Sequence, residues 1–163
     1  MGNNFNIRFA KREDTELVLD FIKELADYEE LLDEVVADKQ TLENSLFDRE
    51  MAEVIIAEYK DKAVGFALFF HNFSTFLGKP GIYLEDLYVK PEYRGKGFGK
   101  KLLAFLADLT VKRDCGRLEW WVLDWNKPSI EFYESLGAKA MDEWTVYRLT
   151  GDSLENLAGE LNE

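Results

Sequence analysis

The sequence predicts one mixed α/β domain in which antiparallel and parallel strand pairs share a sheet. Two observations predict this class. The apolar segments in the first half of the chain have strand lengths and short connecting turns, which favours antiparallel hairpins. In the second half, strands alternate with helical patterns, and helical crossovers join strands that run parallel. The order β-α-α-β-β-β-α-β-α-β-α contains no repeat or linker, so we expect a single domain over residues 1–163.

The chain begins with a short strand and two helices. Residues 5–9 alternate as a strand, and Asp14 is expected to cap a helix that runs to about Leu32. A second, short helix is expected to begin near Asp38. The apolar residues of the first helix recur with a period of about 3.6 residues: Leu17, Val18, Phe21, Ile22, Leu25 and Tyr28.

Three strands are expected next. The segments AEVIIAEY and AVGFALFFHNF flank Lys60-Asp61-Lys62, which predicts a hairpin. A loop with Gly78, Pro80 and Gly81 leads into a strand at residues 82–89, and Pro91 ends that strand.

The second half of the chain continues with a long helix from about Gly97 to Arg113, stopped by Cys115-Gly116. The segment RLEWWVL then predicts a further strand. Pro128 fits the first turn of a short helix, SIEFYESL, which Gly137 ends. Residues 138–149 are expected to be extended, and Asp152 to cap a terminal helix.

Composition excludes several classes of protein. Apolar residues make up 47% of the 163 residues, as in a globular protein. Lys plus Arg number 20 against 32 Asp plus Glu, a net charge of -12, which argues against nucleic-acid binding and favours small cationic ligands. The sequence shows neither a signal-peptide pattern nor the roughly 20 consecutive apolar residues of a membrane span. The single cysteine, Cys115, fits a reducing compartment, so we expect a cytoplasmic protein without membrane or nucleic-acid partners.

The histidine content limits the chemistry. His71 is the single histidine, and Cys115 has no second cysteine to pair with, so no metal site is expected. His71 lies in an apolar, strand-like run, where a structural role is favoured over that of a catalytic base. Any catalysis must therefore rest on other groups.

The stretch VKPEYRGKGFGKKLL, residues 89–103, concentrates glycine and positive charge before a helix. Residues 90–101 hold five Lys or Arg and one Glu, a local charge of +4. Because helix N-termini favour anions and glycines allow close approach, this segment predicts a phosphate or pyrophosphate cradle, with a solvated basic turn as the alternative. A P-loop is excluded because Arg94 stands where its first glycine belongs and Lys101 where its Ser or Thr belongs. The dinucleotide-binding motif GxGxxG is excluded because Lys100 stands where its third glycine belongs.

The segment Arg94-Gly95-Lys96-Gly97-Phe98-Gly99 matches the R-x-x-G-x-G signature of the GNAT acetyltransferases. It stands in that family's usual setting, after an apolar strand and V-x-P and before a long helix. The blocks KELADYE, IYLEDLYVKPEYRGKGFG and DWNKPSIEFYESLGA resemble, in order, the diamine (spermidine/spermine) acetyltransferase branch. The resemblance implies the GNAT-like acyl-CoA N-acyltransferase fold, acetyl-CoA as acetyl donor and a homodimer.

The resemblance also implies three segments that contact acetyl-CoA. The strand before the glycine turn would form backbone hydrogen bonds with the pantetheine arm. This strand and RLEWWVL would diverge, and acetyl-CoA would lie in the gap between them. The turn would hold the pyrophosphate, and a later polar segment would flank the cofactor; on pattern alone that segment caps a helix, and Asn126 and Ser129 could do both. The implied residues are Leu87, Tyr88 and Val89, then Arg94, Gly95, Lys96, Gly97, Phe98, Gly99 and Lys100, then Asn126, Lys127, Pro128 and Ser129.

Two catalytic roles follow from the resemblance. Tyr133 stands at the position of the family's general acid, beside the cofactor, although on pattern alone it is an aromatic residue of a helix face. A tyrosine of pKa about 10 can protonate a departing thiolate whose conjugate acid has a pKa of about 8.5, given favourable position and electrostatics. Glu85 matches the acidic residue beside the substrate amine, acting through water, and Asp86 is its neighbour. In a regular strand these two face opposite sides unless a β-bulge intervenes, and we rank Glu85 first.

The amine site implied by the resemblance combines carboxylates with aromatic rings, which suits a cationic ligand. For any single acidic residue, a solvated surface position is an equal alternative. The segment MDEWTVYRL departs from the branch, with Thr145 at a polyamine-contacting position, which leaves polyamine specificity open. The implied substrate residues are Tyr28, Glu29, Glu85, Asp86, Glu119, Trp120 and Trp121.

We therefore expect an acetyl-CoA-dependent N-acetyltransferase that acts on a primary amine of a small cationic substrate, with a polyamine or diamine ranked first. Alternatives are a lysine-like amino acid such as thialysine, or a protein amine. An alternative of another class is a non-catalytic acyl-CoA-binding interaction module, which the presence of both the glycine turn and Tyr133 disfavours.

Overall fold

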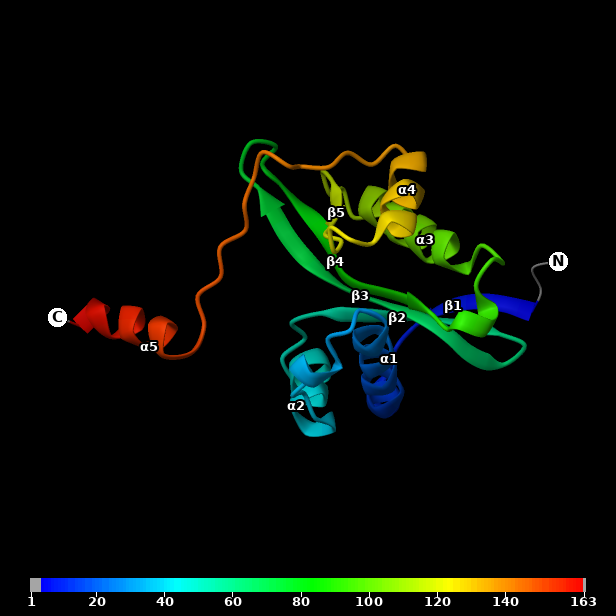
Figure 1. Ribbon diagram of the computed structural model, residues 1–163, viewed down its shortest axis with the longest axis horizontal. Coiled ribbons are helices and arrows are strands. Elements are labelled where there is room, and N and C mark those ends of the chain that lie inside the picture. Colours follow the sequence, from blue (N-terminus) through cyan, green and yellow to red (C-terminus); the bar gives the residue numbers. More distant parts are fainter. Residues whose placement is uncertain (1–3, 163) are drawn as a thin grey trace. The chain divides into compact units, whose positions relative to one another are not determined.

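A computed structural model describes residues 4–162, which contain a five-stranded sheet flanked by helices (Figure 1). The first four strands pair as antiparallel neighbours in chain order, and the fifth joins the fourth in parallel. This mixed pairing confirms the predicted fold class. The strands are β1 (Phe5–Phe9), β2 (Glu53–Tyr59), β3 (Lys62–Ser74), β4 (Lys79–Val89) and β5 (Leu118–Trp120).

The α-helices of the described residues are α1 (Thr15–Tyr28), α2 (Lys39–Glu43), α3 (Phe98–Lys112), α4 (Lys127–Ser135) and α5 (Gly151–Gly159). Short 3-10 turns lie at Arg12–Asp14, Leu32–Glu34, Pro91–Tyr93 and Glu160–Asn162, and a π-helical turn at Asn44–Asp48 follows α2. None of these helices is long and apolar enough to cross a bilayer.

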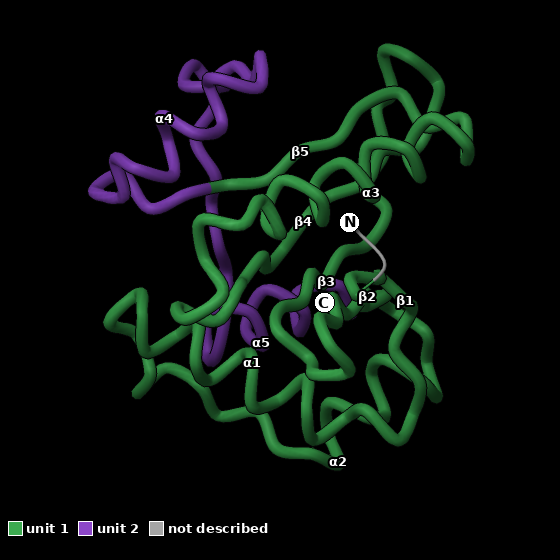
Figure 2. Tube along the Cα trace, turned by 90° about the vertical axis from the view of Figure 1, so that its right-hand side faces the viewer, with its two compact units in different colours: residues 1–121 green, residues 122–163 purple. Residues whose placement is uncertain are grey.

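The chain divides into two compact units, Met1–Trp121 and Val122–Glu163 (Figure 2). Unit 1 carries the sheet with α1, α2 and α3, and unit 2 carries α4 and α5. Residues 138–149 form no hydrogen-bonded strand, so the last strand of the expected order is wrong, and RLEWWVL is a strand over Leu118–Trp120 alone. The single domain over residues 1–163 stays a prediction, and residues 1–3 and 163 lie outside the described residues.

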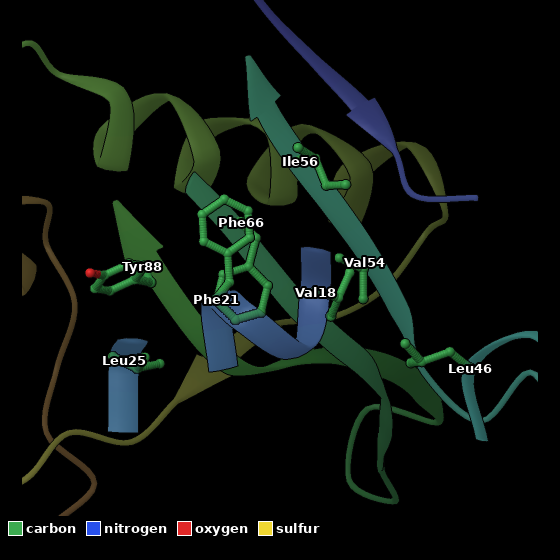
Figure 3. Packing of buried hydrophobic residues seen from close by; sticks show 8 residues of the cluster. All are labelled: Val18, Phe21, Leu25, Leu46, Val54, Ile56, Phe66 and Tyr88. Carbon is green, nitrogen blue, oxygen red and sulfur yellow. The ribbon is translucent and has the colours of Figure 1, made fainter. Parts of the chain in front are cut away.

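In unit 1, α1 and α2 cover one face of the sheet and α3 covers the other (Figure 1). The core on the α1 face includes two stacked rings, Phe21 of α1 and Phe66 of β3, with centroids 5.2 Å apart. Burying these side chains contributes about 25 cal/mol per Å² of apolar surface removed from water. The cluster consists of Val18, Phe21, Leu25, Leu46, Val54, Ile56, Phe66 and Tyr88 (Figure 3).

Helix α1 ends earlier than the sequence predicts. Its last residue is Tyr28, and Glu30 takes a left-handed conformation with φ 62. The Glu30 N–H donates to the Asp27 carbonyl and the Leu31 N–H to the Ala26 carbonyl, which together form a Schellman motif. Helix α3 likewise ends before a non-glycine left-handed residue, Asp114 with φ 56. Because glycine is the usual signal for such an end, the sequence does not reveal the stop after Tyr28.

The predicted helix caps have different outcomes. Asp38 is confirmed, since its carboxylate accepts a hydrogen bond from the Thr41 N–H at 2.8 Å. Asp14 holds the N-cap position of α1, but its carboxylate pairs with Arg8 at 2.8 Å instead of capping the helix. The expected cap at Asp152 is wrong, because Thr150 is the N-cap residue of α5 and Asp152 lies in the first turn.

Candidate active site

Beyond Leu84, the edge of β4 that faces away from β3 has no strand partner among the described residues. Its parallel pairing with β5 covers Ile82–Leu84, whereas β4 itself runs on to Val89. The Lys90 N–H donates to the Val64 carbonyl of β3 at 2.8 Å. Since alternate residues of a strand direct their amide groups to opposite neighbours, Tyr88 addresses β3, and Leu87 and Val89 address the other edge. Of the three residues predicted to bond pantetheine, Leu87 and Val89 direct their amide groups away from β3, while the Tyr88 ring is buried in the core; their role stays a prediction.

The glycine turn presents backbone donors at the start of α3. Gly95 and Gly97 both lie in the left-handed region, with φ 81 and 82, and Gly97 is the N-cap residue. The first helical bond runs from the Lys101 N–H to the Gly97 carbonyl, so the N–H groups of Phe98, Gly99 and Lys100 have no partner within the helix. A Cβ atom at Gly95 or Gly97 would meet nothing within 4 Å, so backbone conformation and not space requires these glycines. Such a turn is suited to an anion.

The side chains of the turn divide into anchors and surface charges. Phe98 is buried, and its ring stacks on Phe5 with centroids 4.4 Å apart and lies 5.1 Å from the Tyr59 ring. It therefore fixes the start of α3 against β1 and β2 and can offer a ligand only its backbone. Lys96 and Lys100 are exposed and can add positive charge at the turn. The Arg94 side chain instead turns back onto β4, where its Nε donates to the Val89 carbonyl at 2.9 Å.

A β-bulge separates the two candidate carboxylates of β4. In the pairing of β3 with β4, Phe69 lies opposite Leu84 and Leu68 lies opposite Asp86, so Glu85 is the extra residue. Leu84 and Asp86 therefore face opposite sides of the sheet: Leu84 is buried on the α3 face, and Asp86 shares the α1 face with Leu68. Glu85 is exposed and Asp86 is half-buried.

Burial and neighbouring carboxylates raise pKa values near this bulge. Burial, followed by the charges of Glu85 and Glu29, raises the pKa of Asp86 to about 7. Burial also raises the pKa of Glu29, the residue after α1. The pKa of Tyr83 is raised by burial and by the charges of Glu85 and Glu119. We call Glu29, Glu85, Asp86 and Glu119 the acidic cluster. A protonatable carboxyl among carboxylates attracts cations and can accept a proton near neutral pH.

Of the predicted substrate residues on β5, Glu119 lies on the side of the acidic cluster and Trp120 does not. Glu119 pairs with Tyr83 and so lies on the α1 face, but its Oε1 accepts from Asn72 Nδ2 at 3.0 Å and pairs with Arg117 Nε at 3.1 Å. Trp120 pairs with Leu84 and therefore lies on the α3 face, away from Asp86. Of the predicted aromatic residues, Tyr28 and Trp121 are 41% and 48% exposed and can contact a ligand. Tyr83 was missed, because its proximity to the acidic cluster depends on the bulge.

Unit 2 carries the remaining predicted residues. Asn126 is buried, and its Oδ1 accepts a hydrogen bond from the Ser129 N–H at 3.4 Å, so its capping role is confirmed. Pro128 lies in the first turn of α4 as predicted, and Lys127 begins the helix. Tyr133 lies on α4, half-buried beside Phe132 with ring centroids 5.6 Å apart.

His71 belongs to a structural network. Its Nε2 lies 3.2 Å from the Arg113 guanidinium, which also binds Glu53 at 2.7 and 2.9 Å. Among the described residues, no group of three or more His, Cys, Asp or Glu side chains has the arrangement of a metal site.

Comparison with known proteins gives the chain a family. The sequence profile of the acetyltransferase (GNAT) family matches residues 18–138. The chain belongs to the GNAT acetyltransferase family. A thialysine N-epsilon-acetyltransferase of Sus scrofa is 38% identical over an alignment that covers 94% of this chain and 97% of its own. A spermidine/spermine N(1)-acetyltransferase-like protein of Homo sapiens is 32% identical and covers 96% of this chain but 24% of its own.

A solved structure shares the fold of this chain. An integron cassette protein from the mobile metagenome of V. cholerae is similar with a TM-score of 0.80 and 32% identity, covering 96% of this chain and 99% of its own. GNAT acetyltransferases use acetyl-CoA as the acetyl donor. The residues of this GNAT chain fit that donor: a nest of N–H groups at α3 suits its pyrophosphate, and the strand edge at Leu87 and Val89 suits its amide-bearing arm.

Proposed function

We propose that this GNAT protein transfers the acetyl group of acetyl-CoA to a primary amine of a small cationic acceptor. The acidic cluster carries the proposal, because it places several carboxylates beside the strand that leads into the glycine turn. Its charge attracts an ammonium group, and the partial burial of Glu29, Asp86 and Glu119 strengthens that attraction relative to bulk water.

Acceptors related to lysine come first and polyamines second. Relatives of nearly the same length, from Sus scrofa and Bos taurus, are named thialysine acetyltransferases at 38% and 37% identity. The spermidine/spermine-like relative keeps the polyamine expectation open, because its name refers to aliphatic polyamines. Both classes carry a terminal amine on a flexible chain and need a carboxylate partner. A protein amine and a non-catalytic acyl-CoA-binding module stay alternatives.

In the proposed reaction the neutral amine attacks the thioester carbonyl, so that a C–N bond forms and the C–S bond breaks. Asp86 accepts the proton that the amine must lose, directly or through water. We rank it before Glu85, reversing the sequence-based order, because a carboxyl of pKa about 7 is a stronger base than an ordinary carboxylate. Glu85 would then hold the acceptor and keep the pKa of Asp86 high. Tyr133 donates a proton to the departing thiolate, as the family resemblance implies.

Binding of the donor would rest on backbone groups. The N–H groups of Phe98, Gly99 and Lys100 would receive the pyrophosphate, with Lys96 and Lys100 adding charge. Leu87 and Val89 would orient the arm that carries the thioester. The homodimer and the cytoplasmic location stay predictions; light scattering at twice the chain mass would support the dimer.

A thiol-release assay with acetyl-CoA tests the proposal. The acceptor panel contains thialysine, lysine, ornithine, spermidine, tyramine and a peptide with a free N-terminus. We expect the highest kcat/KM with a lysine-like amino acid or a polyamine, and a mass increase of one acetyl group on the acceptor. Acetyl-CoA binding without thiol release for any amine would instead support the binding-module alternative.

A further inference from the structure

Arg94 contacts both halves of the proposed site. Its backbone leads directly into Gly95, the first left-handed residue of the glycine turn. Its side chain points the other way, with Nε donating to the Val89 carbonyl at 2.9 Å. Its guanidinium carbon lies 5.0 Å from the centroid of the Tyr28 ring and 5.5 Å from that of Tyr88. Arg94 thus connects the glycine turn, the end of β4 and the last residue of α1.

Tyr28 belongs to the proposed binding site for the acceptor amine. It is followed by Glu29, whose charge contributes to the raised pKa of Asp86. The polypeptide turns sharply here, because Glu30 adopts φ 62. Any group that holds the Tyr28 ring therefore also limits the position of Glu29 relative to Asp86.

The last turns of α1 are attached to β4 by side chains that come from β4 and its end. The Tyr88 hydroxyl donates to Glu24 at 3.1 Å, and Lys90 Nζ pairs with the same carboxylate at 2.9 Å. Burial and the neighbouring Glu24 raise the pKa of Tyr88 to about 12, which keeps its hydroxyl protonated as a donor. Figure 3 shows the Tyr88 ring at the β4 end of the cluster, with Leu25 of α1 nearby. Arg94 adds the contact that comes from the glycine turn itself.

We propose that Arg94 is a positioning residue that couples acetyl-CoA binding at the turn to the acceptor site at Tyr28 and Glu29; this rests on the proposed function. An anion bound at residues 95–100 fixes the backbone that carries Arg94. The fixed guanidinium then holds the Tyr28 ring by cation–π attraction, which depends on its position over the ring face. Coupling of this kind is reciprocal, so a bound acceptor also strengthens donor binding.

The matched variants are Arg94→Lys, which keeps the charge but loses Nε and the planar guanidinium, and Tyr28→Leu, which removes the ring. Tyr28→Phe keeps the ring and is the control. We expect R94K and Y28L each to raise the acceptor KM about three- to fivefold, as for the loss of one partly exposed cation–π contact. Y28F should change the acceptor KM much less than Y28L does. The Kd of acetyl-CoA alone, from calorimetry, should stay within about twofold in R94K, because the glycine backbone and the charge remain.

The double variant decides whether the two residues act together. If the two residues act together, R94K/Y28L raises the acceptor KM no more than Y28L does. If instead the double variant raises the acceptor KM by the product of the two single effects, the residues act independently and the proposal is wrong. A raised Kd of acetyl-CoA in R94K, together with an unchanged acceptor KM, would show that Arg94 is a phosphate ligand and would also contradict the coupling proposal.

Hydrogen exchange at residues 25–30 supplies a readout that needs no acceptor. Acetyl-CoA should slow exchange there in the native protein and not in R94K, and equal slowing in both would contradict coupling. If acetyl-CoA binds but no amine is acetylated, the proposed function fails while this measurement still decides the coupling.

Discussion

Replacing Asp86 by Asn should make the protein more stable and less active. The asparagine side chain has nearly the same shape but cannot ionise. In the fold the Asp86 carboxyl has a pKa of about 7 against an ordinary value of 3.8, because it is half-buried and faces Glu85 and Glu29. The native protein therefore holds this proton more tightly than the unfolded chain does, and ionisation of Asp86 opposes folding.

The sign and size of the effect follow from these two values. Below about pH 4 the carboxyl is protonated in both states, so it adds no pH dependence. Between about pH 4 and pH 7 the unfolded chain loses the proton and the folded chain keeps it, so the free energy of unfolding falls as pH rises. The difference of about 3 between the pKa values, at about 1.4 kcal/mol each, sets an upper limit of about 4 kcal/mol above pH 7.

Urea unfolding followed by tryptophan fluorescence measures this effect in native and D86N protein at pH 4.5 and pH 8. We expect D86N to gain up to about 3 kcal/mol over the native protein between these two pH values, because at pH 4.5 the unfolded chain has already lost most of this proton. The control is Asp108→Asn: Asp108 lies in an exposed pair with Lys112 on α3 and should shift stability by about 0.5 kcal/mol or less. At the same time, kcat of D86N should fall. A stability difference between D86N and native protein that is the same at both pH values would refute the reasoning.

Three further predictions concern the proposed site. Glu85→Gln removes one charge that raises the pKa of Asp86, so the acidic limb of the kcat/KM profile should move to lower pH from about 7; an unmoved limb would assign it to another group. Gly97→Ala forces a side chain into φ 82, which costs about 1–2 kcal/mol, and should weaken acetyl-CoA binding by calorimetry about tenfold. Gly159→Ala, in α5, is its matched control and should leave that affinity unchanged. Tyr133→Phe should lower kcat at least tenfold while the acetyl-CoA Kd stays constant, and equal turnover would exclude Tyr133 as the general acid.

The features that the sequence predicted well depend on neighbouring residues. The hairpin at Lys60-Asp61 is confirmed, with φ 51 and 64 at these two positions, as two-residue turns between antiparallel strands require. The place of Gly97 at the start of α3 and that of Pro128 in the first turn of α4 are also confirmed, because both depend on neighbouring residues of the chain. The length of α1 was wrong, because Glu30 adopts a conformation for which glycine is the common signal.

The candidate site stays a prediction. Most of its residues lie on the elements that the sequence predicts, although Glu29 follows α1 and Trp121 follows β5, and the sheet face of each residue depends on contacts between elements. The sequence could not decide whether Glu85 and Asp86 share a side, and it offered no sign that Arg94 reaches Tyr28. Trp120 was expected beside the substrate, yet its register with Leu84 turns it to the α3 face.

The sequence by itself determined the family, the order of the elements as far as α4 and the glycine turn, because these depend on local backbone preferences and on a short motif. Only the tertiary structure decided which carboxyl is perturbed. The extra residue in β4 becomes visible when β3 is laid beside it, and the bulge turns Asp86 to the α1 face, where Glu29 also acts on it. Burial and like charges then shift its pKa, and both arise from residues distant in the chain.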